Sequence, residues 1–317
     1  MRAAVLNKFG SVDSVRIEEV DTPEPSEQEI QIQVHSAGVN PADWKICEGY
    51  FKDRMKHEFP ITLGWDVSGV VSKVGKSVKN VKEGDPVLAY CRKNDVIHSG
   101  SFAEFICLDY RNIAHKPQNL THTQAASIPL VSLTAWQSLF DSAHLKANEQ
   151  VLIHAGAGGV GSFAIQFAKI KGAKVFTTAS QKHHDYVKKL GADTVIDYTK
   201  EDFVQKVKSL TPQGVDVVYD CVGGKTLTSS YDIAKTGGRL VTIAGVVDNT
   251  LAEKRHIEAN FVFVRPDGKE LGEITKLIEA GKVFIPEIEE MGFDQVVPAL
   301  KKVQEGHTQG KIVLRIR

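Results

Sequence analysis

The feature that most constrains the fold is a segment at 151–169, where an apolar run meets a glycine-rich turn and then a helical pattern. The run Val151–Ala155 is strand-like, and Gly156–Gly161 has the spacing Gly-x-Gly-x-x-Gly. Glycine permits a tight turn and a close approach of the backbone, while the following helix N-terminus offers free N–H groups and a positive dipole end. Strand, turn and helix in this order predict a site for the pyrophosphate of a dinucleotide.

The residue that closes the next expected strand, at 174–179, bears on which dinucleotide is bound. An Asp or Glu about 20 residues after the glycines would accept hydrogen bonds from the ribose 2′-hydroxyl of NAD(H). This chain has Ser180, Gln181 and Lys182 there instead. A hydroxyl and a cation suit the 2′-phosphate of NADP(H), which a carboxylate would repel. An ordinary solvated turn has the same residues, but the missing carboxylate favours NADPH, which we predict as the cofactor.

Composition excludes several kinds of partner. Lys+Arg and Asp+Glu both number 39, so the basic excess of a nucleic-acid-binding protein is missing. The N-terminus turns polar too early for a signal peptide, and no apolar run reaches the roughly 18 residues of a membrane span. The four cysteines are scattered without a Cys-x-x-Cys pair, which is typical of reduced thiols. We therefore expect a cytoplasmic protein with no nucleic-acid or membrane partner.

The pattern of elements changes twice along the chain. The first third alternates apolar and polar residues between Gly and Pro turns, as in 29–34, and predicts a β-rich region. Strands that alternate with helices follow after about residue 120, and this predicts a parallel sheet covered on both faces. These strands are expected at 151–154, 174–179, 194–197, 215–220 and 239–244. The C-terminal part predicts helices around 271–278 and 296–303 and a last strand at 311–316.

Several separated motifs, in one order along the chain, carry a resemblance to a known family. They lie at 37–45, 63–71, 156–161, 190–198, 263–268 and 310–314. In these motifs the chain resembles the zinc-free quinone oxidoreductase-like branch of the medium-chain dehydrogenase/reductase superfamily. The resemblance implies an α/β fold in which a Rossmann-type, doubly wound parallel sheet at 121–257 binds NADPH. This domain would be inserted in a β-rich, GroES-like catalytic domain formed by 1–120 and 258–317.

The positions of zinc ligands in that superfamily hold other residues here. Its zinc enzymes carry Cys where this chain has Asn40 and His where it has Trp65, and their third ligand aligns near Leu130. Asn, Trp and Leu cannot provide the thiolate and imidazole that zinc prefers. The four-cysteine structural lobe is also missing, since only Cys91 and Cys107 lie in that region. We expect no catalytic metal.

Without a Lewis acid, hydride addition to a conjugated double bond is better suited to this chain than oxidation of a simple alcohol. We predict an NADPH-dependent reductase of quinones or α,β-unsaturated carbonyls. The resemblance points to Lys45 and Tyr50 as donors to the developing negative charge and to Asn40 as a contact of substrate or nicotinamide. The alternatives are a surface lysine, a packing aromatic and an asparagine that holds its loop. Two rival functions are an alcohol dehydrogenase and an NADPH-binding sensor or interaction protein with little turnover.

The resemblance also assigns the cofactor contacts. It implies that the glycine turn binds the pyrophosphate, that Ser180 and Lys182 face the 2′-phosphate and that Tyr198 covers the adenosine. The nicotinamide would be framed by residues of the linker helix and of the turn after the fifth strand, and the last strand would also reach the cofactor. The residues beyond those already named are Gly156, Gly158, Gly159, Val160, Thr134, Gly245, Val246 and Lys311. Phe261–Val264 resembles an edge strand through which such proteins dimerise, so a homodimer is expected.

Overall fold

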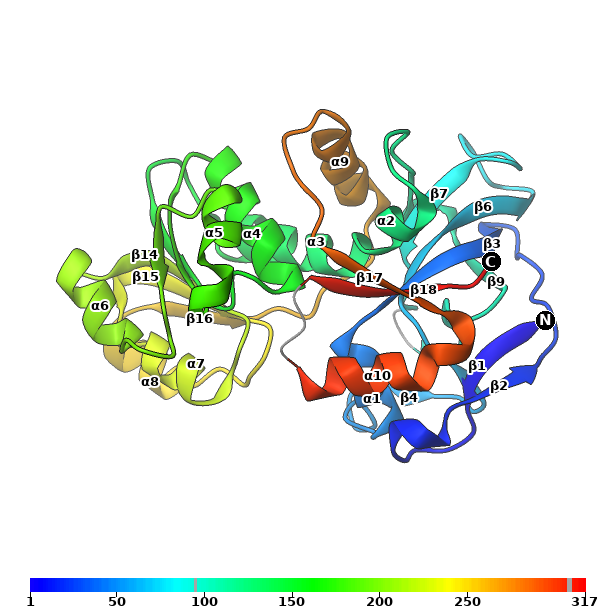
Figure 1. Cartoon of the computed structure of the whole chain (residues 1–317), viewed down its shortest axis with the longest axis horizontal. Helices are drawn as coiled ribbons and strands as arrows, with labels where there is room; N and C mark the ends of the chain where they lie inside the picture. The colour runs from blue at the N-terminus through cyan, green and yellow to red at the C-terminus, as the bar shows by residue number, and fades with distance from the viewer. Residues whose placement is uncertain (94–95, 307–309) are drawn as a thin grey trace. The chain divides into compact units, whose positions relative to one another are not determined.

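The structure, a computed structural model, describes residues 1–93, 96–306 and 310–317. The chain divides into two compact units, which Figure 1 shows coloured along the sequence. Unit 1 consists of Met1–Leu133 and Arg265–Arg317, and unit 2 of Thr134–Val264. Unit 2 is therefore an insertion in the sequence of unit 1, as the sequence pattern indicates.

Unit 2 is built on a parallel sheet of six strands in the order β13-β12-β11-β14-β15-β16. The strands are β11 (Gln150–Ile153), β12 (Lys174–Thr178), β13 (Thr194–Ile196), β14 (Val215–Asp220), β15 (Ala234–Thr242) and β16 (Glu258–Phe261). The order reverses between β11 and β14, which is the switch point of a doubly wound, Rossmann-type sheet. The predicted fold class is confirmed, with a sixth strand beyond the five expected.

Helices join the strands of unit 2. They are α4 (Gly159–Ile170), α5 (His184–Lys189), α6 (Phe203–Leu210), α7 (Gly224–Ser230) and α8 (Asn249–Arg255). The helices α4 and α5 lie on one side of the sheet and α7 and α8 on the other (Figure 1). The sheet is consequently apolar on both faces, and Leu152, Phe176, Val218 and Leu240 of four neighbouring strands are all nearly or fully buried in one core.

Unit 1 is β-rich. Its largest sheet has seven strands in the order β10-β7-β6-β3-β18-β17, with β9 also paired to β3, and a smaller sheet has the order β2-β1-β5. The bounds are β1 (Arg2–Leu6), β2 (Arg16–Glu19), β3 (Glu29–Val39), β4 (Lys56–His57), β5 (Ile61–Thr62), β6 (Asp66–Val74), β7 (Pro86–Tyr90), β8 (Val96–Ile97), β9 (Phe105–Asp109), β10 (Ile113–His115), β17 (Ile288–Gly292) and β18 (Lys311–Arg315). β3 is central, and its buried Ile30, Ile32 and Val34 pack in the core of the unit.

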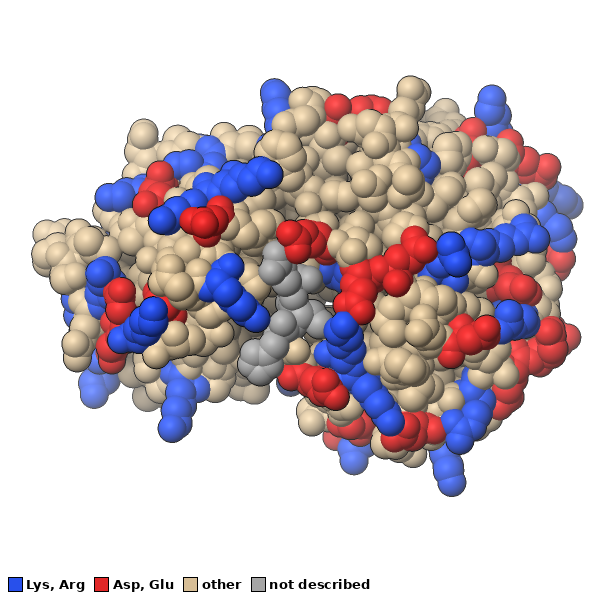
Figure 2. All heavy atoms as spheres, viewed as in Figure 1, with Lys and Arg blue, Asp and Glu red and all other residues tan. Residues whose placement is uncertain are grey.

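The helices of unit 1 are α1 (Pro41–Cys47), α2 (His122–Ala126), α9 (Gly268–Glu279) and α10 (Val296–Glu305), and α3 (Pro129–Trp136) begins in this unit. The two C-terminal helices and the last strand expected from the sequence are confirmed as α9, α10 and β18. In the described part of the chain, no helix has both the length and the apolar character to cross a membrane. On the face in Figure 2, acidic and basic side chains are interspersed, in line with their equal numbers.

The limits of unit 2 differ from the insertion proposed at 121–257. The helix α2 begins at His122 but belongs to unit 1, where it packs against β3 and β6. Residues 258–264 belong to unit 2, because β16 adds to the edge of its sheet beside β15. Short helices and edge strands of this kind carry no composition change that marks a boundary.

Candidate functional site

The glycine-rich turn of unit 2 lies between β11 and α4, as predicted. A Cβ at Gly156 would lie 2.1 Å from the Thr177 hydroxyl oxygen, and one at Gly161 would lie 2.3 Å from the carbonyl oxygen of Ala155. The turn enters with Ala155 in the left-handed region, at φ 55°. Both glycines are therefore required by close packing of the turn against β12 and against itself.

The first turn of α4 provides the backbone donors. Its N-cap is Gly158, which has no side chain to satisfy them. The N–H groups of Gly159, Val160 and Gly161 have no acceptor within the helix, since only from Ser162 does the i to i−4 pattern begin. These groups and the dipole suit an anion such as pyrophosphate. The N–H of Gly158, also predicted to face the phosphates, instead donates to Ala155 at 3.0 Å and does not support that role.

Loops after three neighbouring strands meet at the same edge of the sheet as this turn. The N–H of Gly156 donates to the carbonyl of Thr178 at the end of β12, at 3.0 Å. The N–H of Ala179 in turn donates to Ile196 at the end of β13, at 3.1 Å. Hydrogen bonds thus fix the segments after β12 and β13 beside the glycine turn.

The predicted contacts of the adenosine half stand in these two segments. Ser180 is half-buried and directly follows Ala179, and Lys182 is exposed. Tyr198 follows β13 with 55% of its surface exposed, although it is a large aromatic residue. The structure therefore brings Ser180, Lys182 and Tyr198 to one edge of unit 2, where a hydroxyl, a cation and a ring face can act on a phosphorylated adenosine.

The other predicted contacts in unit 2 differ in accessibility. Val246 is 81% exposed, in the turn after β15. A Cβ at Gly245 would lie 2.6 Å from Leu227 Cδ2, so this turn packs closely on α7. Thr134 is only 4% exposed, and its carbonyl accepts a hydrogen bond from the Tyr219 hydroxyl at 3.3 Å. Backbone groups near Gly245 and Val246 are accessible, whereas Thr134 is an interior residue of this unit.

Sequence reasoning missed Asp220, which organises that same edge. It is fully buried at the end of β14 and accepts the N–H groups of Val222 and Gly223, each at 3.1 Å. It also accepts the Thr242 hydroxyl of β15 at 2.7 Å. The sequence did contain a signal for this role, namely an acidic residue at the end of an apolar strand. A buried carboxylate there needs hydrogen-bond donors, which neighbouring strands and loops can supply.

In unit 1, Lys45 and Tyr50 both contact Trp44. The Lys45 ammonium is 5.6 Å from the centre of the Trp44 ring system, and the Tyr50 ring meets Trp44 edge-on at 5.4 Å. Lys45 is half-buried, and burial lowers the pKa of its ammonium. In the described ranges no carboxylate pairs with it within 4.0 Å. The two predicted donors are thus adjacent at the end of α1.

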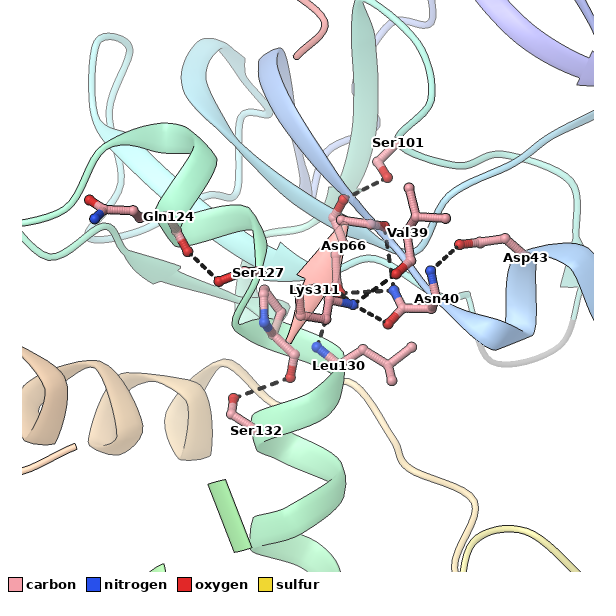
Figure 3. Close-up of polar contacts among 12 residues, drawn as sticks. Val39, Asn40, Asp43, Asp66, Ser101, Gln124, Ser127, Leu130, Ser132 and Lys311 are labelled. Carbon is pink, nitrogen blue, oxygen red and sulfur yellow. Dashed lines mark hydrogen bonds and ion pairs between the residues drawn. The ribbon is translucent and has the colours of Figure 1, made fainter. Parts of the chain in front are cut away.

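Asn40 and Lys311 lie instead in a buried polar cluster with Asp43 and Asp66 (Figure 3). Asn40 is fully buried: its amide nitrogen donates to Asp66 at 2.8 Å and its amide oxygen accepts from Lys311. The Lys311 ammonium also donates to the Val39 carbonyl at 3.0 Å and lies 3.4 Å from Asp66. These contacts favour the alternative that Asn40 holds its loop, and they do not support a direct contact between Lys311 and a cofactor.

The electrostatics of this cluster follow from burial. Burial raises the pKa of Asp43 to about 7, and Asp66 adds to this, while the N–H of Asn40 and the charge of Lys311 lower it. Burial also raises the pKa of Asp66, against the effect of Lys311 and its hydrogen-bond donors. The pKa of Lys311 is lowered by burial, which both carboxyls oppose. Two acids face one base in a site that water does not reach.

The residues at the zinc-ligand positions do not fit zinc. Asn40 is engaged as described, and the buried Trp65 packs its ring 6.0 Å from those of Phe51 and Tyr90. Leu130 contributes its backbone N–H, which donates to Asp66 at 2.7 Å. Within 1–93, 96–306 and 310–317, no group of three or more His, Cys, Asp or Glu residues could hold a metal ion. These residues provide no thiolate or imidazole for zinc at those positions.

Comparison with known proteins identifies the relationship. Residues 26–118 match the alcohol dehydrogenase GroES-like domain, and residues 190–314 match a family described as zinc-binding dehydrogenase. The chain is 34% identical over its whole length to the mitochondrial NAD(P)H oxidoreductase RTN4IP1 of Danio rerio, covering 91% of that protein. It is 36% identical to the chloroplastic NADPH-dependent alkenal/one oxidoreductase of Arabidopsis thaliana, over 99% of this chain and 79% of that one.

A solved structure agrees with these relatives. The quinone oxidoreductase from Coxiella burnetii superposes with a TM-score of 0.89 and is 35% identical, covering all of this chain and 99% of its own. The match extends over both units, so the resemblance seen in the sequence motifs is confirmed at full length. The chain belongs to the quinone oxidoreductase-like branch of the medium-chain dehydrogenase/reductase superfamily.

Proposed function

We propose that this protein reduces quinones or α,β-unsaturated carbonyls with NADPH and without zinc. The observation that carries the proposal is the edge of unit 2 where the glycine turn, Ser180 and Lys182 meet, with no carboxylate at the position that NAD(H) requires. The relatives named as an alkenal/one oxidoreductase and a quinone oxidoreductase support the same reaction class. The predicted oxidoreductase activity agrees with both names, and the predicted cofactor agrees with that of the alkenal/one oxidoreductase.

The residues of unit 2 fit the cofactor. The first-turn N–H groups of α4 would bind the pyrophosphate, and Ser180 and Lys182 would bind the 2′-phosphate. Tyr198 offers an exposed ring to the adenosine. When bound, NADPH supplies a hydride, which forms a C–H bond at the β-carbon of the acceptor while the carbon–carbon π electrons move toward the carbonyl oxygen.

The chain must then stabilise negative charge on the carbonyl oxygen and supply a proton at the α-carbon. Lys45 suits both tasks, because its ammonium is half-buried with a lowered pKa and so releases a proton more readily than an exposed lysine. Tyr50 is the second candidate, since it is 62% exposed beside Trp44. We assign Lys45 as the donor and Tyr50 as a contact of the substrate.

A kinetic panel tests the proposal. NADPH oxidation is followed with 1,4-benzoquinone, 9,10-phenanthrenequinone and a short 2-alkenal, with NADH in parallel and a simple secondary alcohol with NADP⁺ as control. We expect turnover that prefers NADPH, none with the alcohol, and no inhibition by a chelator. Lys45→Met should lower kcat, with Lys302→Met as a surface control. Tight NADPH binding without turnover on any acceptor would favour the sensor or interaction protein.

Separate observations support proposals for the assembly and the location. β16 ends the strand order of unit 2, and Phe261 in this strand and Phe263 just after it are 41% and 42% exposed. Apolar edge strands pair readily with a second copy, so we infer a homodimer that Phe261→Lys would weaken in analytical ultracentrifugation. Three of the four cysteines are buried thiols and the fourth is half-buried, which fits a reducing compartment. We propose the cytoplasm, although two relatives are named as organellar.

A further inference from the structure

The buried cluster of unit 1 is not used by any step proposed above. Asn40, Asp43 and Asp66 are fully buried, and Lys311 is 5% exposed. The four residues come from the loop before α1, from α1, from β6 and from β18. A buried ion pair seldom stabilises a protein more than apolar residues of similar volume would. Stability therefore does not explain why charges stand at this place.

The Lys311 ammonium is fixed by acceptors in three directions. They are the Val39 carbonyl at 3.0 Å, the amide oxygen of Asn40 and the Asp66 carboxylate at 3.4 Å. An ammonium has three N–H donors, so this set uses all of them. Lys311 thereby determines which way the Asn40 amide points, because only its oxygen can accept from a lysine.

Asp66 completes the orientation from the other side. One carboxylate oxygen accepts a hydrogen bond from the Asn40 amide nitrogen at 2.8 Å. The other accepts one from the backbone N–H of Leu130 at 2.7 Å (Figure 3). Gly38 stands opposite Asp66 in the pairing of β3 with β6, and a Cβ there would lie 3.0 Å from the carboxylate. The carboxylate is thus enclosed, with both oxygens occupied.

These contacts hold the first turns of two helices. Asn40 is the N-cap of α1: its N–H donates to the Asp43 carboxylate at 2.7 Å, and its carbonyl accepts the Asp43 N–H at 3.0 Å. Leu130 is the second residue of α3. One carboxylate, Asp66, therefore connects the sheet to the start of α1, which carries Lys45, and to the start of α3.

We propose that Asp66 is a positioning residue of the reductase site. Through its hydrogen bond with Asn40, it fixes the position of α1 and therefore of Lys45 on that helix. The inference rests on the proposed function, since Lys45 is the donor assigned there. Asp66 itself is fully buried and bonded on both oxygens, so it acts through Asn40 rather than on substrate. A charged carboxylate is needed, because a neutral side chain would remove the ion pair with Lys311 and the charged acceptor of the Asn40 amide nitrogen.

A purely structural role makes a different prediction. If Asp66 only stabilised the fold, its loss would lower the melting temperature but leave kcat of the folded enzyme unchanged. A positioning role lowers kcat with unchanged affinity for NADPH, because the residues proposed to bind the cofactor all lie in unit 2. It also loosens α1 locally, which amide hydrogen exchange detects without any assay of activity.

The test compares the full chain with Asp66→Asn, Lys311→Met and the double variant, with Lys302→Met as control. Lys302 pairs with Glu289 at 2.6 Å on the surface of the same unit. The readouts are kcat with the best acceptor, the Kd of NADPH, and hydrogen exchange at 40–50 and at 159–170. We expect Asp66→Asn to lower kcat about 10- to 100-fold, with faster exchange at 40–50 only. The double variant should recover part of both effects, because it leaves no unpaired charge.

The possible results distinguish the positioning role of Asp66 from the proposed reductase function. Unchanged exchange at 40–50 in Asp66→Asn overturns the positioning role, whatever the activity. Faster exchange with unchanged kcat in an active enzyme also overturns it. If the unaltered protein reduces no acceptor, the proposed function fails, while the exchange data still show whether Asp66 holds α1. If Asp66→Asn does not fold, the double variant replaces it and must show slower turnover than Lys302→Met.

Discussion

The two units build their sites in contrasting ways. The site of unit 2 depends on backbone groups in one continuous stretch, Gly156–Gly161, where the N-cap Gly158 has no side chain that could occupy the helix donors. The site of unit 1 depends on side chains that lie far apart in sequence, and Asp66 and Lys311 are 245 positions apart. The geometry of the unit 2 site depends on the absence of side chains at its glycines. The geometry of the unit 1 site depends on the pairing of buried charges.

This contrast predicts how each site fails. A backbone site tolerates changes of exposed side chains but not a Cβ where the chain packs on itself. A site of buried charges does not tolerate the loss of one partner, yet it can tolerate the loss of both. The substitutions below test these two expectations, beginning with the largest effect.

Lys311→Met is expected to have the largest effect on stability. It leaves Asp66 buried without a cation, and breaking a buried ion pair in this way costs about 3–5 kcal/mol. Asp66→Asn combined with Lys311→Met should regain most of that loss. Urea denaturation of the full chain measures the free energies of unfolding. Lys302→Met, at the surface, should cost no more than about 1 kcal/mol, and equal losses for the two lysines would contradict the account.

Asp43 should make stability depend on pH in an unusual direction. Its pKa is raised to about 7, so the folded chain holds this proton more tightly than the unfolded chain. The stabilisation is fully present below the unfolded pKa, near 4, and is lost as the pH rises through about 7. Asp43→Asn should therefore equal the wild type in acid and exceed it at pH 8, by up to about 4 kcal/mol.

The charged groups that face Asp43 are Asp66 and Lys311, so the substitution also affects them. The difference between the two curves is the informative quantity, because groups outside the cluster contribute equally to both. Parallel curves between pH 4 and pH 8 would show that Asp43 titrates as an ordinary carboxyl.

The same contrast explains which parts of the molecule could be predicted from its sequence. In unit 2, short apolar strands that alternate with helices and the turn at 156–161 are local patterns, and right-handed crossovers convert them into one sheet order. In unit 1, β18 had to pair with β3 and β3 with β6 before Lys311 could reach Asp66. No local pattern contains that information.

Individual residues show the same limit. Asn40 and Lys311 were recognised as site residues from motifs, but the motifs do not say that their side chains turn inward. Asp66 stands in the motif 63–71 as an acid within an apolar strand, next to Trp65 at a zinc-ligand position. Such an acid needs a buried partner, and this physical requirement was the one signal of the cluster that the sequence contained.

A Cβ in the glycine turn tests the other side of the comparison. Gly161→Ala places an atom 2.3 Å from the Ala155 carbonyl, and the backbone must shift to accept it. We expect a loss of about 1–3 kcal/mol in stability and weaker NADPH binding, since the donors of α4 move with the turn. Gly272→Ala in α9 is the matched control, because outside the neighbouring backbone of the helix no described atom lies within 4 Å of its Cβ. That change should stabilise the chain slightly.

The smallest effect concerns cofactor choice and leaves the fold intact. Ser180→Asp places a carboxylate where the 2′-phosphate is proposed to bind, so repulsion should weaken NADPH binding about tenfold or more, or about 1.4 kcal/mol. The same carboxylate can accept from the ribose hydroxyls of NADH, whose affinity should rise. Fluorescence titration of both cofactors measures this, with Gln181→Ala as an exposed, neutral control. Because only side chains at an accessible edge change, stability should stay within about 0.5 kcal/mol of the wild type, unlike every substitution in the buried cluster. An unchanged preference for NADPH would mean that this edge of unit 2 does not bind the 2′-phosphate and that other residues select the cofactor.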